Sequence, residues 1–126
     1  MEEAKKKVLI VEDDLQISKV YEIQLKKEGF VTVTAHNGED AIKLLLEEKP
    51  DLITLDLMIP KKDGFEVLQD IKENFPDIKI PIIVISNLGQ EGDKERAMTL
   101  GATEFLVKTD HAIQEVMSKI KGYVNK

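Results

Sequence analysis

The stretch LITLDLMIPKKDG, residues 52–64, places one carboxylate, Asp56, inside an apolar run typical of a buried strand. Burying a polar group without a partner costs about 2–7 kcal/mol, and burying a charge costs more. A buried carboxylate without a partner therefore either destabilises the fold or takes up a proton. A carboxylate is also a nucleophile that can form an acyl phosphate. Other parts of the chain must therefore supply a cation or hydrogen-bond donors to Asp56.

Short β-branched runs alternate along the chain with longer segments of helical period. This alternation predicts βα units around an open, doubly wound parallel sheet of the α/β class with five strands and five helices. Gly29 and Pro50 mark helix ends, and Asp63-Gly64 opens a helix. The predicted strands are 7–11, 31–35, 51–56, 80–86 and 103–108. One helix is predicted after each strand: from residue 15 to Gly29, from the HNGED turn through Leu46, from Gly64 through Ile71, a helix that includes Ala97–Leu100, and a last helix over about 110–123.

Function in such sheets lies outside the carboxyl ends of the strands, so the residues that end each strand are the candidates. These residues are three acids after the first strand, one after the third, a hydroxyl and an amide after the fourth, and an amine and a hydroxyl after the fifth: Glu12, Asp13, Asp14, Asp56, Ser86, Asn87, Lys108 and Thr109. Asp14 also suits a helix cap, and His36 and His111 are assigned to the surface. The acids, Ser86 and Lys108 are expected to meet at one edge.

Composition narrows the classes of function. The 126 residues, 42% of them hydrophobic, fit one domain with a core over about 6–124. A formal charge of -6 disfavours direct nucleic acid binding and an anionic membrane surface. The absence of cysteine excludes a thiolate metal site and suits a reducing compartment. With no candidate signal peptide or membrane span, we expect a cytoplasmic protein.

From about Lys6 to the last helix the chain resembles the receiver domain of bacterial response regulators, the CheY-like domains of two-component signalling. The pattern D-x-x-x-P-x-x-D-G, from Asp56 through Pro60 to Asp63-Gly64, is a pattern of that family. The resemblance implies a flavodoxin-like fold with strand order 2-1-3-4-5. It also implies that Asp56 accepts a phosphoryl group in an Mg²⁺-dependent reaction, which makes the domain a catalyst of its own phosphorylation and dephosphorylation without turnover of an external substrate.

The same resemblance assigns roles to individual residues. The implied Mg²⁺ set is Asp13 and Asp56 directly, Glu12 through water and the carbonyl of Met58. Lys108 would pair with Asp56 and then with the phosphoryl group, while Ser86 would bind the phosphoryl group and Phe105 would change position as switch residues. Met58 and Leu88 would flank the phosphoryl group and shield it from water. Two residues depart from the family pattern, Asn87 where a small residue is usual and Thr109 where proline is usual, and a trans bond before Thr109 is expected.

The resemblance implies a sensor histidine kinase or a phosphotransfer protein as phosphodonor, with Ile17 and Val20 as contacts. The output face would comprise the helix that carries Ala97, strand 103–108 and the last helix, and it would contact a downstream protein target as a monomer or a phosphorylation-dependent dimer. The chain ends soon after that helix, so we expect either no output domain or a receiver taken from a longer protein.

Three other classes of function fit less well. A flavodoxin-like electron carrier would need a glycine- and hydroxyl-rich first loop, where this chain has VEDDLQ. A phosphatase using an aspartyl-phosphate would need an acid where Met58 stands. A phosphorylation-independent pseudo-receiver that acts as an interaction module remains the alternative, and it is disfavoured because every charged position is filled.

Overall fold

A computed structural model describes residues 5–87, 91–108 and 113–124. Five parallel strands form one sheet in the order β2-β1-β3-β4-β5, as predicted. Strands and helices alternate along the chain: β1 (Lys7–Val11), α1 (Leu15–Lys27), β2 (Val31–Ala35), α2 (Gly38–Glu48), β3 (Leu52–Leu55), α3 (Gly64–Asn74), β4 (Ile82–Ser86), α4 (Glu91–Thr99), β5 (Glu104–Val107) and α5 (Ile113–Val124).

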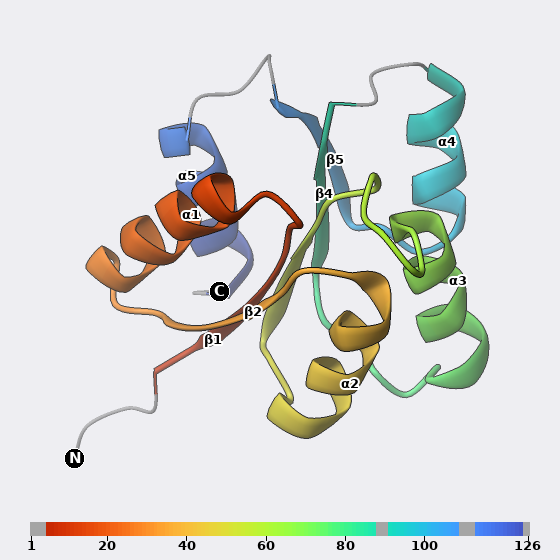
Figure 1. The fold of residues 1–126 in the computed structure, drawn as a ribbon, viewed down its shortest axis with the longest axis horizontal. Helices are drawn as coiled ribbons and strands as arrows, with labels where there is room; N and C mark the ends of the chain where they lie inside the picture. Colours follow the sequence, from red (N-terminus) through yellow and green to blue (C-terminus); the bar gives the residue numbers. More distant parts are fainter. Residues whose placement is uncertain (1–4, 88–90, 109–112, 125–126) are drawn as a thin grey trace.

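Helices cover both faces of the sheet. Figure 1 shows α1 and α5 on one face and α2, α3 and α4 on the other. Side chains of a strand alternate between faces, so β1 contributes Leu9 and Val11 to the core under α2 and α3, and Val8 and Ile10 to the core under α1 and α5. Because both faces are buried, the central strands β1, β3 and β4 read as nearly continuous apolar runs.

Local sequence signals set the ends of several helices. Asp14 caps α1 by accepting hydrogen bonds from the N–H groups of Gln16 and Ile17, which confirms its predicted role as a cap. Asp63 and Glu66 form a reciprocal capping box at the start of α3. Gly29, with φ of 95°, follows α1 in the left-handed conformation that glycine tolerates best.

Some predicted bounds differ by one to a few residues. β3, β4 and β5 are each shorter than predicted. β4 begins at Ile82 because Pro81, whose carbonyl accepts from the Ile53 N–H, has no N–H of its own for the ladder. The second helix continues past Leu46 to Glu48, and Lys49 ends it with a φ of 48°. α5 is described from Ile113 to Val124, and the predicted start near residue 110 lies outside the described residues.

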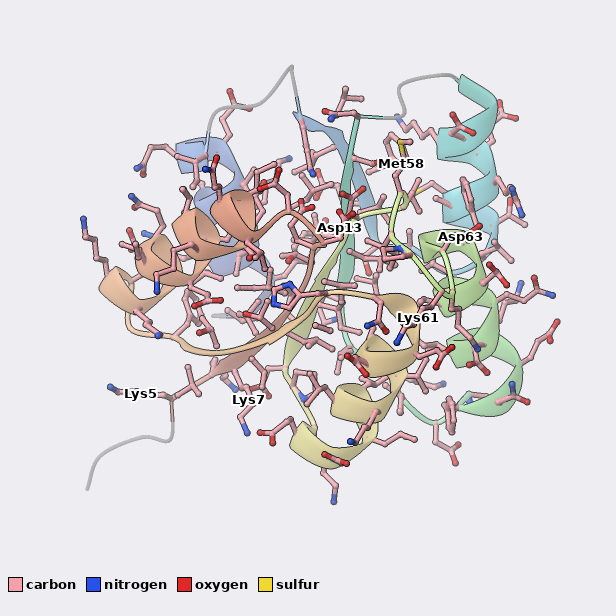
Figure 2. The ribbon with its side chains drawn as sticks, in the orientation of Figure 1. Lys5, Lys7, Asp13, Met58, Lys61 and Asp63 are labelled. Atoms are coloured by element: carbon pink, nitrogen blue, oxygen red, sulfur yellow. The ribbon has the colours of Figure 1, made fainter. Side chains whose placement is uncertain are left out.

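Strand register brings the functional residues to one level. Val11 of β1 is paired with Leu55 of β3, so the next residues, Glu12 and Asp56, leave the sheet side by side. Ser86 of β4 is paired with Val107 of β5, which places Lys108 beside them. Figure 2 shows Asp13 and Met58 at this edge of the sheet, with Lys5 and Lys7 at the opposite edge.

Candidate functional site

Asp56 has partners for both carboxylate oxygens. It is 7% exposed. Its Oδ1 accepts hydrogen bonds from the Met58 N–H at 3.0 Å and from the Ser86 hydroxyl at 3.2 Å. Its Oδ2 lies 3.0 Å from Lys108 Nζ. These donors and the lysine charge explain how a carboxylate is tolerated after an apolar strand.

Glu12 is the most deeply buried acid of the site, at 3% exposure. Its Oε1 lies 2.5 Å from Lys108 Nζ, and its Oε2 accepts a hydrogen bond from the Asp14 N–H at 3.2 Å. Burial raises the pKa of Glu12 to about 6, although the hydrogen bonds from Lys108 and Asp14 act in the opposite direction. Glu12 is therefore mostly ionised near neutral pH and holds a proton in mild acid.

Lys108 is shared between two carboxylates. Burial lowers the pKa of Lys108, but the hydrogen bonds to Glu12 and Asp56 outweigh burial, and the net pKa is raised above the usual value for lysine. The ammonium group therefore stays charged at neutral pH. The sequence predicted its pairing with Asp56; its contact with Glu12 was not predicted, because Glu12 was assigned only to the metal.

Asp13 completes an acidic cluster and is exposed to solvent. One oxygen from each of Glu12, Asp13 and Asp56 lies within 4.8 Å of the other two. Three carboxylates are the hard oxygen donors that Mg²⁺ and Ca²⁺ prefer, and this donor set fits a divalent cation. Met58 lies next to this cluster, because its N–H donates to Asp56 Oδ1, and the residue is 58% exposed.

Gly64 fixes the path of the loop that follows Asp56. Its N–H donates to the Leu57 carbonyl at 3.0 Å. A Cβ atom on Gly64 would lie 2.6 Å from Leu57 Cα and 2.7 Å from the Asp56 carbonyl oxygen, so only glycine allows this approach of α3 to the loop. The Asp63-Gly64 pair of the sequence pattern thus caps α3 and holds the loop of Asp56.

The remaining predicted residues have different surroundings. Phe105 is partly buried and packs against the core under α2 and α3. Ile17 is partly buried, and Val20 is 47% exposed on α1. Asn87 is exposed. Leu88, Thr109 and His111 lie outside the described residues.

Sequence reasoning missed a role for His36. The residue is exposed, as predicted, but its Nδ1 lies 2.9 Å from the carbonyl oxygen of Glu12. β2 ends in Ala35, which carries no functional group, so the end of this strand gives no direct signal. His36, the residue after β2, lies beside the end of β1 because Val11 and Ala35 are paired. The strand order and the residue after β2 were therefore the available signal.

Comparisons with known proteins agree with this geometry. The model of the response regulator receiver domain family matches residues 8–121. The chain is 42% identical over 106 residues to the "Probable transcriptional regulator ycf27" of Guillardia theta, a match that covers 84% of this chain and 41% of that protein. The chain thus spans less than half the length of that curated relative.

Solved structures of receiver domains superpose closely on the chain. The BeF3-activated N-terminal receiver domain of RstA from Klebsiella pneumoniae gives a TM-score of 0.87 at 25% identity, with 96% of this chain and 100% of that chain covered. The signal receiver domain of a response regulator from Bermanella marisrubri gives 0.86 at 31% identity, with 96% and 99% covered.

This chain belongs to the response regulator receiver domain family and has the CheY-like, flavodoxin-like fold of its members. It is the receiver domain of a two-component response regulator. Receiver domains of this kind interact with histidine kinases and downstream effectors and generally bind Mg²⁺ in an acidic pocket. None of the helices in the described ranges combines the length and the apolar character needed to span a bilayer.

Proposed function

We propose that this domain is a phosphorylation-activated switch in which Asp56 accepts a phosphoryl group from a phosphohistidine. The observation that carries the proposal is the placement of Asp56, whose two oxygens contact Ser86 and Lys108 while Glu12 and Asp13 lie beside it. A pseudo-receiver that acts only as an interaction module would not need an acceptor, a lysine and an acidic cluster together.

In the transfer, an oxygen of Asp56 forms a bond to phosphorus as the bond between phosphorus and the donor's imidazole nitrogen breaks. The donor ring keeps the electron pair of that bond, and Asp56 becomes an acyl phosphate. Lys108 has its charge 3.0 Å from Asp56 Oδ2 and can follow the new negative charge onto a phosphoryl oxygen. Ser86, fully buried, can move its hydroxyl from Asp56 to the phosphoryl group.

Asp13 and Asp56 would hold Mg²⁺ directly, with Glu12 acting through water and Met58 through its carbonyl. The ion would supply positive charge that lowers the repulsion between the carboxylate and the incoming phosphoryl oxygens. The exposure of Asp13 supports its assignment as a direct ligand. Glu12 is already bound to Lys108 and to the Asp14 N–H, which supports the indirect role.

Once Asp56 is phosphorylated, Ser86 and Phe105 would move. Their movement would alter the face formed by α4, β5 and α5. We propose that a sensor histidine kinase or a phosphotransfer protein is the donor and that it contacts α1 near Ile17 and Val20. The altered face would then contact a downstream protein, with this domain acting as a monomer or as a phosphorylation-dependent dimer. A histidine kinase takes its phosphoryl group from ATP, which supports a cytoplasmic location, and the charge of -6 supports no direct nucleic acid binding.

Intact-mass measurement after treatment with acetyl phosphate and Mg²⁺ tests the proposal. The wild type should gain the mass of one phosphoryl group, and the Asp56→Asn variant should gain none. Asp77→Asn, which alters an exposed aspartate away from the site, is the matched control and should be modified like the wild type. A wild type that stays unmodified, or an Asp56→Asn variant modified as fast as the wild type, would contradict it and favour the pseudo-receiver.

A further inference from the structure

His36 makes a directed contact with the loop that carries Glu12 and Asp13. Its Nδ1 lies 2.9 Å from the Glu12 carbonyl oxygen. A carbonyl oxygen can only accept a hydrogen bond, so Nδ1 must carry the hydrogen. The Nδ1–H tautomer and the doubly protonated ring both meet this requirement, which makes the contact independent of the charge of the ring.

This contact completes the anchoring of Glu12. The Glu12 N–H donates to the Ala35 carbonyl at 3.0 Å, and the Glu12 carbonyl accepts from His36. Both oxygens of the Glu12 side chain are also bound, one to Lys108 and one to the Asp14 N–H. Asp13 follows directly in the chain, so the position of its backbone depends on how firmly Glu12 is held.

The segment from Ala35 to Gly38 also contacts the loop that carries Asp56 and Met58. The Gly38 N–H donates to the Pro60 carbonyl at 3.3 Å. A Cβ atom on Gly38 would lie 1.8 Å from the Lys62 carbonyl oxygen, so the two backbones are in direct contact there. One short segment therefore braces both loops of the acidic cluster.

We propose that His36 is a positioning residue for the divalent cation: through the Glu12 carbonyl it holds the loop of Asp13 at the distance from Asp56 that the cation requires. This inference rests on the proposed Mg²⁺-dependent phosphorylation. His36 does not touch the cation or the phosphoryl group. Groups that orient metal ligands commonly change metal affinity about 10- to 100-fold when altered, and an exposed contact acting through the backbone should fall below that range.

Two variants separate the donor from the ring. Asn has a side-chain nitrogen on Cγ, where His has Nδ1, so His36→Asn keeps a donor near the Glu12 carbonyl, whereas His36→Leu has a similar volume and no donor. Mg²⁺ binding is followed by backbone amide shifts of Asp13 and Asp56 in an NMR titration. The Mg²⁺ dependence of phosphorylation by acetyl phosphate is measured in parallel.

We expect His36→Leu to raise the Mg²⁺ concentration at half-saturation about three- to tenfold in both measurements. This effect lies below the range of about 10- to 100-fold that is typical of groups bound directly to a metal ligand. The rate at saturating Mg²⁺ should stay within about twofold of the wild type, and His36→Asn should restore most of the affinity. In the wild type, the ¹⁵N spectrum should show a hydrogen on Nδ1 of His36 at a pH where the ring is neutral.

Unchanged Mg²⁺ affinity in His36→Leu would overturn the inference while leaving the proposed function intact. Equal loss of affinity in His36→Leu and His36→Asn would also overturn it, because the ring and not the donor would then be responsible. A wild type that binds no Mg²⁺ and accepts no phosphoryl group would instead remove the proposed function and this inference together. Circular dichroism of both variants confirms that each has folded.

Discussion

Replacing Lys108 by Met tests how the acidic site is stabilised. Lys108 Nζ lies 2.5 Å from Glu12 Oε1 and 3.0 Å from Asp56 Oδ2, and methionine keeps a similar apolar stem without the charge. The variant therefore has two buried carboxylates that have lost their cation. We expect it to fold and to be less stable than the wild type in the absence of metal.

The magnitude follows from the two contacts. At the effective dielectric constant of about 20 that suits protein sites, the gross attraction is roughly 6–7 kcal/mol for the contact with Glu12 and roughly 5–6 kcal/mol for the contact with Asp56. Desolvation of the three groups offsets much of this attraction, and breaking a buried ion pair costs about 3–5 kcal/mol. The side chain of Lys108 is 15% exposed, so water screens the contacts in part. We expect a loss of about 2–4 kcal/mol in the free energy of unfolding near pH 8.

The loss should depend on pH, because Glu12 can take up a proton. The pKa of Glu12 is about 6 in the wild type, and removal of Lys108 raises it further. Its unfolded value is 4.5, so above that pH the folded variant holds a proton that the unfolded chain releases. The free energy of unfolding then falls as pH rises from 4.5 through the raised folded pKa. The difference from wild type should be smaller near pH 5 than near pH 8, and part of it should remain at pH 5 because the contact of Lys108 with Asp56 is lost at both pH values.

Urea unfolding followed by circular dichroism at about pH 5 and pH 8, without metal, measures both effects. Lys121→Met is the matched control, since Lys121 contacts Glu28 at 2.6 Å on the surface, with 43% and 30% of the two side chains exposed. Its loss should be below about 1 kcal/mol at both pH values. A loss of unfolding free energy in Lys108→Met that is as large at pH 5 as at pH 8, or no larger than that of the control at pH 8, would refute the assigned role of Lys108.

Three further outcomes follow from the geometry. Gly38→Ala should lose about 2–3 kcal/mol of unfolding free energy in the urea assay, because its Cβ would overlap the Lys62 carbonyl. Gly122→Ala is the control in α5: its Cβ would meet nothing within 4 Å, and the variant should gain about 0.5–1 kcal/mol. Asp13→Ala should abolish Mg²⁺ binding in an NMR titration and slightly stabilise the metal-free protein; normal phosphorylation would contradict the assignment. Met58→Asn should speed loss of the phosphoryl group about tenfold after the donor is removed, since an amide can orient water; unchanged decay would contradict the shielding role.

The fold and most of the site could be predicted because they depend on short-range signals. Apolar runs located the strands, and the capping residues Asp14 and Asp63 located two helix starts. The rule that parallel strands end at one edge then placed Asp56, Ser86 and Lys108 together, and their hydrogen bonds confirm that they meet. Each strand end could be located from residues adjacent in sequence, and one general rule about parallel sheets then joined the ends of different strands.

The contacts that sequence reasoning missed all join residues far apart in the chain. Lys108 and Glu12 are 96 residues apart, and their contact depends on which way two long side chains turn at the sheet edge. The contact of Gly38 with Lys62 depends on how closely two loops approach, which no local pattern encodes. The period of the sequence gives the face of an element, whereas the choice among rotamers and loop paths is made by packing.

The balance of charge at the site explains why a divalent cation and a phosphoryl group belong together in the proposed switch. Three carboxylates and one ammonium, Glu12, Asp13, Asp56 and Lys108, leave a formal charge of two negatives near neutral pH, which one divalent cation would offset. Converting Asp56 to an acyl phosphate replaces one negative charge by about two. The added charge has no compensating group in the unphosphorylated arrangement, so any movement that brings the Ser86 hydroxyl and Lys108 onto the phosphoryl oxygens lowers the energy of the phosphorylated state alone. In the proposed switch, that difference in interaction energy would allow phosphorylation to shift the population of the α4–β5–α5 face.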